Sequence, residues 1–75
     1  MKVWITRNKG FEGLWGDNTV YIWTALPQEN KINDIVFYTY ASKCLLFDLH
    51  YKTFEERYGF TPEEGTCTEK ELILK

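Results

Sequence analysis

The sequence is poor in cysteine and has no long apolar run, and both absences restrict what the protein can be. Its 75 residues include two cysteines, Cys44 and Cys67, which are too few for a disulfide-stabilised scaffold. We therefore expect two reduced thiols, with a single Cys44–Cys67 disulfide left open as the alternative. No stretch approaches the roughly 20 apolar residues of a membrane-spanning helix, and the N-terminus has no apolar signal-peptide core. These absences predict a cytoplasmic protein without a membrane partner.

The sequence also lacks a strong excess of charge of either sign. Its 9 basic and 11 acidic residues give a net charge of −2, and the basic residues form no cluster along the chain. Binding that is driven by phosphate neutralisation needs such a cluster, so nucleic acid is not an expected partner.

Aromatic side chains, in contrast, are abundant. They make up 17% of the chain, as 3 Trp, 5 Tyr and 5 Phe, and each large ring buries on the order of 150–250 Å². A chain of this length buries only about 60% of the surface that its unfolded form exposes, so we expect some rings to be partly exposed. Exposed Trp and Tyr are typical of contact surfaces, although a Tyr at a sheet edge with its hydroxyl in water is the more common arrangement.

Alternating β-branched and aromatic residues predict antiparallel strands over most of the chain. We expect strands at residues 2–7, 19–26, 35–40 and 44–51, and a shorter one at 11–15. Pro27 ends the strand before it, because proline cannot donate to a ladder. Residues 27–33 are predicted to be a polar connection.

Alternation also assigns the faces of these strands. In the first strand, Val3 and Ile5 share one face, and Trp4 and Thr6 share the other. In the strand at 44–51 we expect an inward set and an outward set. The inward set is Leu45, Phe47 and Leu49, and the outward set is Cys44, Asp48 and His50.

A helical pattern follows residue 51. Thr53 and Glu56 form a capping box, with Thr53 as the N-cap. Phe54 and Tyr58 then share a helical face, and Gly59 provides a helix stop. This pattern predicts one short helix near residues 53–59.

The segments after this helix are less regular. A repeated start signal at residues 61–64 predicts a single helical turn, because Gly65 follows it. Residues 68–75 fit a helix or a strand, and we favour the strand because so short a terminal helix is marginal in isolation. The chain is therefore predicted to be one α+β domain. It would be a small antiparallel β-sheet or open barrel of about five to six strands with one short helix.

No motif combines the residues that catalysis or metal binding needs. Cys44 and His50 share a strand face, but at roughly 3.3–3.4 Å per residue they lie about 20 Å apart, which is too far for a Cys–His pair. Asp48 and His50 are close enough to hydrogen-bond but lack a nucleophile. A zinc site would need Cys67 and a fourth ligand without the usual paired spacing. We therefore expect no metal, no cofactor and no enzymatic activity.

Four aromatic residues form the candidate binding site. Tyr21 and Trp23 share one face of their strand, and Tyr38 and Tyr40 share one face of theirs. If these two strands pair with those faces aligned, the rings form a platform that stacks a nucleobase or a peptide side chain. The competing interpretation is that the same rings belong to the core or to an oligomer interface. We favour it, because these are the more common roles of aromatic residues in a sheet.

Two terminal segments have a recognisable pattern: Lys2–Arg7 (KVWITR) and residues 69–75 (EKELILK). They resemble the ends of small proteins from Bacteroidetes phages and prophages, which open with a Lys-hydrophobic-Trp-Ile-Ala/Thr-Arg segment and close with a short Glu- and Leu/Ile-containing strand. The middle of the chain, especially residues 11–33, departs from that pattern. The resemblance implies a mobile-element origin and expression in a bacterial cytosol, and it assigns no activity and no functional residue.

Three functional hypotheses follow. The leading one is a non-enzymatic binding protein of phage or mobile-element origin, which inhibits a host defence protein or sequesters a small ligand. The second is a structural, self-assembling protein, since one short helix covers little of a sheet and a second copy would cover more. The third is a small hydrolase or nuclease that uses Asp48 and His50. The expected partner is accordingly another protein, a second copy of the chain in a homo-oligomer, or a small ligand.

Overall fold

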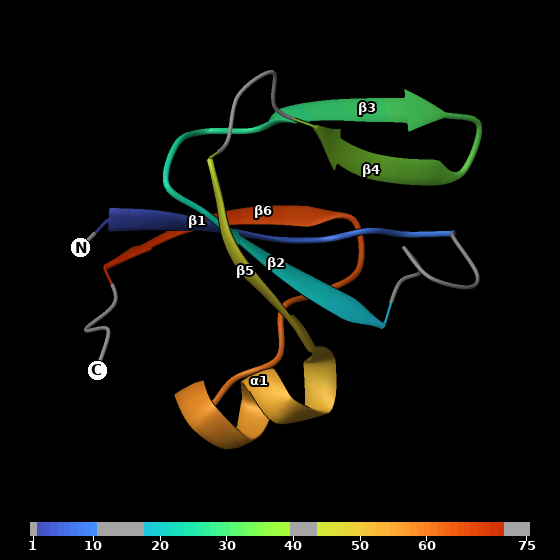
Figure 1. The fold of residues 1–75 in the computed structure, drawn as a ribbon. Helices are drawn as coiled ribbons and strands as arrows, with labels where there is room; N and C mark the ends of the chain where they lie inside the picture. The colour runs from blue at the N-terminus through green and yellow to red at the C-terminus, as the bar shows by residue number, and fades with distance from the viewer. Residues whose placement is uncertain (1, 11–17, 40–43, 72–75) are drawn as a thin grey trace.

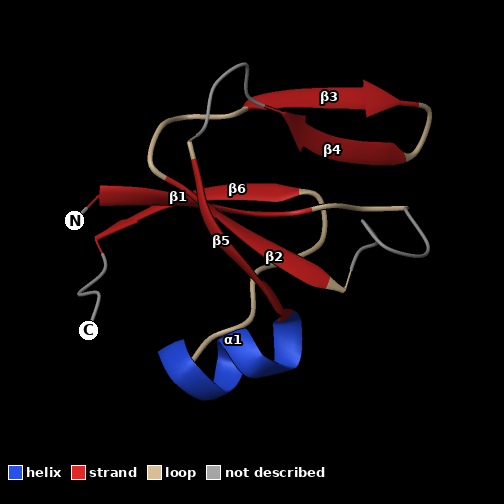
Figure 2. Cartoon of the chain, viewed as in Figure 1, coloured by secondary structure: helices blue, strands red, loops and turns tan. Residues whose placement is uncertain are grey.

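The computed structural model of the chain describes residues 2–10, 18–39 and 44–71. Its elements are, in chain order, β1 (Lys2–Arg7), β2 (Thr19–Trp23), β3 (Gln28–Ile32), β4 (Ile35–Thr39), β5 (Leu45–His50), α1 (Tyr51–Tyr58) and β6 (Thr66–Glu71). Figure 1 shows β3 and β4 on one side of the larger sheet and α1 on the other. Strands dominate the described part and only one helix accompanies them, as Figure 2 shows. The expected small α+β fold of antiparallel strands is therefore confirmed.

Two antiparallel sheets make up the fold. The larger sheet has four strands in the order β5-β2-β1-β6, and the smaller is the β3–β4 hairpin. The described strands do not close into a barrel. The N-terminal strand β1 lies inside the larger sheet, where Ile5 is opposite Ile22 of β2 on one side and Thr68 of β6 on the other. The β-branched and aromatic residues of β1 suit this central place, because they pack on both faces of a pleated surface.

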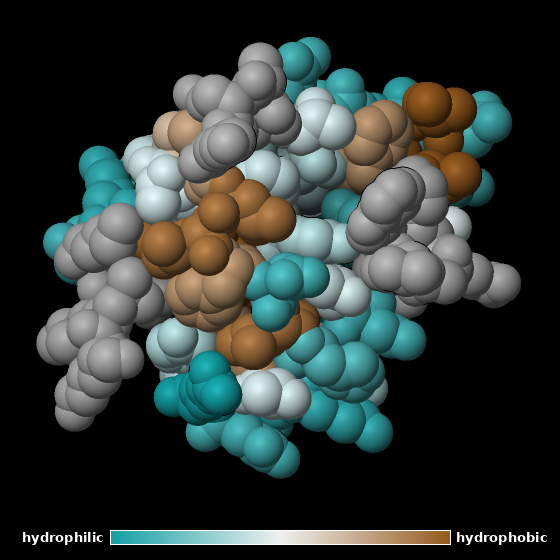
Figure 3. Space-filling view, in the orientation of Figure 1, coloured by the Kyte–Doolittle hydropathy of each residue, from teal (hydrophilic) through white to brown (hydrophobic). Residues whose placement is uncertain are grey.

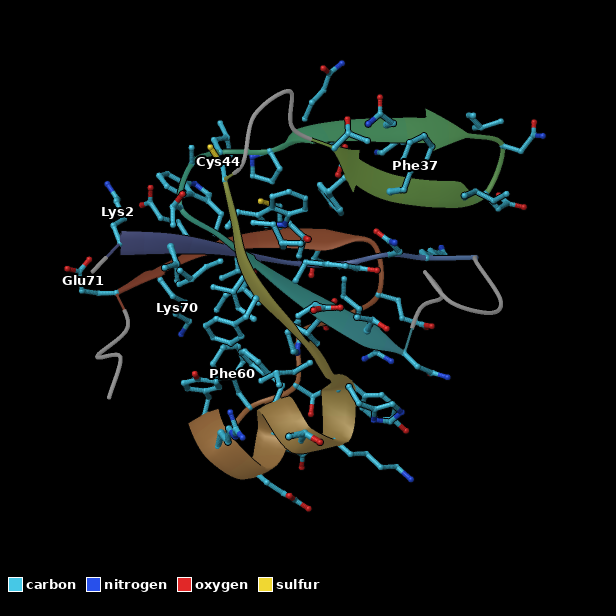
Figure 4. The ribbon with its side chains drawn as sticks, in the orientation of Figure 1. Lys2, Phe37, Cys44, Phe60, Lys70 and Glu71 are labelled. Carbon is cyan, nitrogen blue, oxygen red and sulfur yellow. The ribbon has the colours of Figure 1, made fainter. Side chains whose placement is uncertain are left out.

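The face of the larger sheet toward α1 carries the main core. Its fully buried residues are Val3, Ile5, Val20, Ile22 and Phe54. Phe54 is the buried residue of α1, and its ring meets Phe60 edge-on at 5.1 Å between centroids. The side chain of Lys70 on β6 lies over the Phe60 ring at 4.9 Å (Figure 4). The chain after β5, which consists of α1 and the segment with Phe60, therefore covers this face of the sheet on its way to β6.

The helix begins earlier than the capping box predicts. β5 leads directly into α1, and the N–H of Tyr51 still donates to the Asn18 carbonyl oxygen at 2.9 Å. His50 is the N-cap, and its Nδ1 accepts from the Lys52 N–H at 3.2 Å. Thr53 as N-cap was wrong, because the end of the strand already supplies a capping side chain one turn earlier. Gly59 ends the helix as expected, with φ of 81° in the left-handed region that glycine adopts without strain.

The predicted polar connection at residues 27–33 was wrong over most of its length, because Gln28–Ile32 is strand β3. It pairs with β4 from Gln28 opposite Thr39 to Ile32 opposite Ile35. The hairpin turn is Asn33 and Asp34, and Asn33 has φ of 55°, which Asn tolerates better than most residues. β3 is almost wholly exposed on both faces, so its residues carry no apolar alternation that periodicity could detect.

Other boundaries shift by a few residues. The strand expected at 19–26 ends at Trp23, and Leu26 beyond it is 62% exposed. The segment 61–64 forms no helical turn. The strand expected at 68–75 is confirmed as β6, which begins at Thr66. The expected strand at 11–15 lies outside the described residues, as do residues 72–75.

The structure bears on two of the expectations above, the state of the two cysteines and the lack of a membrane-spanning helix. Cys44 and Cys67 are both free thiols, so the alternative of a disulfide between them is not realised. In the described part of the chain, no helix has the length and apolar character needed to cross a bilayer.

Candidate binding site between the two sheets

A second apolar cluster lies on the face of the larger sheet opposite α1. Trp23 of β2 packs there with Val36 and Tyr38 of β4, and all three are 7–9% exposed. Trp4 and Tyr21, which are half-buried, pack against them. A bridge between Lys9 and Val36 links the strand end of β1 to the hairpin, with N–H to O distances of 2.9 and 3.0 Å. The hairpin therefore covers this face through backbone as well as side-chain contacts.

Trp23 is held by a buried hydrogen bond. Its Nε1–H donates to Thr6 Oγ1 at 2.8 Å, and Thr6 is fully buried. The neighbouring Tyr21 ring lies on the same face, 6.1 Å from the Trp23 ring between centroids and tilted by 35°. The indole N–H is thus held by Thr6, while the ring packs within the aromatic cluster.

Tyr38 links the hairpin to Gly65, the residue just before β6. Its hydroxyl lies 2.9 Å from Glu29 Oε1 and 3.0 Å from the Gly65 carbonyl oxygen, two acceptors that share one hydroxyl proton. Burial raises the pKa of Tyr38 well above its ordinary value, and the bond to Glu29 and the charge of that carboxylate raise it further. The ring is therefore a neutral hydrogen-bond donor over the physiological range.

A pocket of about 440 Å³ opens beside these rings. Four aromatic side chains line it: Tyr21, Trp23, Phe37 and Tyr38. Asn8, Thr39 and Leu45 complete the lining. We call this cavity the inter-sheet pocket, because β2 and β5 supply one wall and β4 the other. Figure 4 marks Phe37 on the hairpin and Cys44, next to Leu45, at the start of β5.

The electrostatics of the inter-sheet pocket disfavour anions. Burial raises the pKa of Tyr21, and the nearby carboxylate of Asp48 raises it further. Glu29 stands at the hydroxyl of Tyr38. Among the described residues, every buried side-chain nitrogen and oxygen has a hydrogen-bond partner. The lining rings Tyr21 and Tyr38 are therefore neutral, and each has a carboxylate close to it, Asp48 for Tyr21 and Glu29 for Tyr38.

Comparison with known proteins provides no assignment. No family model, curated protein or solved structure matches the chain. The inter-sheet pocket is therefore the structural basis for a functional proposal.

The structure brings together three of the four residues predicted for the aromatic site. Tyr21, Trp23 and Tyr38 all line the inter-sheet pocket, whereas Tyr40 lies outside the described residues. The condition set for the platform, direct pairing of the two strands, is not met, since β2 pairs with β1 and β5, and β4 pairs with β3. The rings meet across two packed sheets instead of side by side on one sheet.

Sequence reasoning missed four lining residues, namely Asn8, Phe37, Thr39 and Leu45. Leu45 was assigned to the inward set with Phe47 and Leu49, but only the latter two pack against the core beneath α1. The β2–β5 register shifts between Ile22 and Trp23, and such an irregularity interrupts the alternation of faces. Leu45 consequently lines the pocket and is 44% exposed.

The structure does not assemble a hydrolytic site around Asp48 and His50. His50 Nδ1 is occupied by the helix N-terminus, and no hydrogen bond joins the two side chains. Within the described ranges, no group of three or more His, Cys, Asp and Glu residues is arranged to hold a metal ion.

Proposed function

We propose that the protein is a non-enzymatic binding protein that takes an uncharged aromatic group into the inter-sheet pocket. The observation that supports this is the pocket itself, whose volume of about 440 Å³ is within the range of about 300–1,000 Å³ typical of ligand sites. Four of its lining residues are aromatic. Its origin in a phage or mobile element and its action in the bacterial cytoplasm are parts of the proposal that rest on the terminal sequence segments.

The chemistry of the pocket walls selects the ligand class. Trp23 donates its N–H to Thr6 and Tyr38 directs its hydroxyl to Glu29 and Gly65, so both use their polar atoms within the protein. What they offer a ligand is ring surface, which favours a flat apolar group through stacking and dispersion. The carboxylates of Asp48 and Glu29 make an anionic ligand such as a nucleotide unfavourable.

Two sources can supply such a group: a free small molecule, or an aromatic side chain of a host protein that the binding would inhibit. Native mass spectrometry of protein purified gently from bacterial lysate separates them. A retained small mass identifies sequestration, whereas protein without added mass that captures an aromatic-rich peptide identifies the second source.

The binding itself is tested with two matched probes, N-acetyltryptophanamide and its anionic analogue N-acetyltryptophan. We expect the neutral probe to shift amide signals of the pocket residues in NMR spectra, and the anion to bind several-fold more weakly. Phe37→Ala should weaken binding, because Phe37 is half-buried and lines the pocket. Ile32→Ala is the control, since Ile32 is 58% exposed and is not among the lining residues.

Either of two results contradicts the proposal. One is an absence of shifts at the pocket residues at saturating probe concentration. The other is a Phe37→Ala variant that binds as the wild type does while Ile32→Ala does not. Trp23 and Tyr38 are unsuitable for this test, because both are buried and hold the two sheets together.

A further inference from the structure

One carboxylate close to the inter-sheet pocket has no partner among the residues that the structure describes. Asp48 of β5 is directly opposite Tyr21 of β2, and Tyr21 lines the pocket. Directly opposite residues of an antiparallel pair place their side chains on the same face of the sheet, so Asp48 stands on the hairpin face beside a lining ring. Asp48 is exposed, and it makes no hydrogen bond or ion pair with the described residues.

The register of β2 and β5 sets how close Asp48 is to Tyr21. The Tyr51 N–H donates to the Asn18 carbonyl oxygen at 2.9 Å across this ladder, and hydrogen-bonded pairs alternate along a ladder with pairs that are not hydrogen-bonded. Counted from that bond, Tyr21 and Asp48 form a pair of the second kind, whose Cα atoms are only about 4.5 Å apart. Burial and then the charge of Asp48 raise the pKa of Tyr21, which agrees with this proximity.

Glu29, the carboxylate close to the Tyr38 ring, is already engaged. It accepts the Tyr38 hydroxyl at 2.9 Å, and its second oxygen lies 3.6 Å from Lys31 Nζ. Among the described residues that line the pocket there is no lysine or arginine to neutralise Asp48. Figure 3 shows hydrophobic side chains gathered over the part of the molecule that β5 crosses in Figure 1, with hydrophilic side chains between them.

From this arrangement we propose that the ligand of the inter-sheet pocket is an arylalkylamine, a small molecule in which a short alkyl arm joins an aromatic ring to an ammonium group. The ring packs among the lining rings, and the arm passes Tyr21 to place the ammonium at the carboxylate of Asp48. An ammonium donates charge-assisted hydrogen bonds to a carboxylate, and the face of a Tyr ring attracts it as well. This inference rests on the proposed function and deepens it, because the group inside the pocket is still an uncharged ring.

The experiment compares tryptamine with N-acetyltryptamine in NMR titrations of the full chain at pH 8. Both probes contain the same indole and the same arm, but only tryptamine is positively charged at this pH, as alkylamines are. We expect tryptamine to bind about three- to fivefold more tightly, since an exposed ion pair contributes little. The preference should shrink as salt is added, because salt screens exposed charges.

Two variants of equal charge locate the origin of this preference. Asp48→Asn and Glu29→Gln each remove one negative charge from a chain of net charge −2, so a general attraction of cations would fall equally in both. We expect Asp48→Asn to bind the two probes equally well. Glu29→Gln should keep the preference for tryptamine, and its amide oxygen can still accept the Tyr38 hydroxyl. Circular dichroism spectra of both variants should match the wild type, which shows that folded chains are compared.

The outcomes separate this inference from the function on which it rests. Equal affinity of the wild type for both probes overturns the arylalkylamine assignment and leaves the pocket as a site for neutral aromatic groups. An absence of binding by either probe overturns both. A preference for tryptamine that persists in Asp48→Asn, or that falls equally in the two variants, overturns the role of Asp48.

Discussion

Two buried rings illustrate how single residues join the sheets. Trp23 and Tyr38 come from different sheets, and each places its one polar group on a partner inside the fold: Thr6 for Trp23, and Glu29 with Gly65 for Tyr38. Such bonds satisfy groups that would otherwise be buried without a partner. The same two rings therefore stabilise the fold and form part of the pocket wall.

Replacement of Tyr38 by Phe measures how much the hydrogen bonds of the Tyr38 hydroxyl contribute to the stability of the fold. The variant keeps the ring but leaves the Gly65 carbonyl and Glu29 without the donated hydrogen bond. We expect a loss of about 1 kcal/mol in the free energy of unfolding, measured by urea denaturation. Tyr58→Phe is the matched control, because its hydroxyl makes no hydrogen bond with the described residues, and it should change the free energy much less. Equal losses in both variants would contradict the role assigned to the Tyr38 hydroxyl.

Alkaline pH should destabilise the protein through the same side chain. The pKa of Tyr38 in the folded chain is raised above its ordinary value of 10.0, chiefly by burial, and that of Tyr21 is raised in the same direction. Above the ordinary value the unfolded chain loses these protons and the folded chain retains them, so stability is present below it and falls as pH rises through it. Urea titrations at pH 8 and above pH 10 should show this fall. Tyr38→Phe should reduce it, and an equal fall in that variant would assign the effect to other groups.

At the scale of elements, the ends of α1 are determined by different means. Its N-terminus is capped by the last residue of a strand, whereas its C-terminus depends on the left-handed conformation of Gly59. A Cβ added at Gly59 would meet no atom within 4 Å. Any cost of substitution there is therefore conformational and not steric.

Gly59→Ala should accordingly lower the free energy of unfolding by roughly 1–2 kcal/mol, the cost of a left-handed residue with a Cβ. Gly59→Asn should cost less, because Asn adopts this conformation more readily. Thermal denaturation followed by circular dichroism compares the two. An alanine variant as stable as the wild type would mean that the helix ends in another way.

At the scale of the whole molecule, the larger sheet carries an apolar cluster on each face. The cluster beneath α1 and the cluster beneath the hairpin both use residues of β2, alternating along it: Val20 and Ile22 on one face, Tyr21 and Trp23 on the other. Because the same strands support both clusters, the two faces should unfold together.

Phe54→Ala tests this coupling. Phe54 is fully buried, so its truncation should cost about 3–5 kcal/mol, a large part of the total for so small a domain. The far-ultraviolet signal of α1 and the fluorescence of the tryptophans should be lost at the same, lower urea concentration. Two separate transitions would show that the hairpin face folds independently. Ile32→Ala, at the exposed tip of the hairpin, is the control and should leave the transition unchanged.

Much of the larger sheet could be predicted from local patterns. Val3 and Ile5 on one face of β1 and Trp4 on the other are placed as alternation predicts, because side chains of a strand alternate whatever the strand pairs with. Alternation failed at Leu45, where the register shift between β2 and β5 moves a predicted core residue to the pocket. The aromatic site was predicted in part: its rings were identified, but the geometry that brings them together was not.

Local sequence patterns were enough to predict strands β1 and β2, the faces of those two strands and the helix stop at Gly59, since each depends on neighbours within a few residues. The tertiary structure alone decided that Gln28–Ile32 is a strand, because its polar residues pair with β4 without burying either face. It also decided that Trp23 and Tyr38 meet across two sheets. Such contacts depend on how separate elements pack, and no periodicity along the chain records that packing.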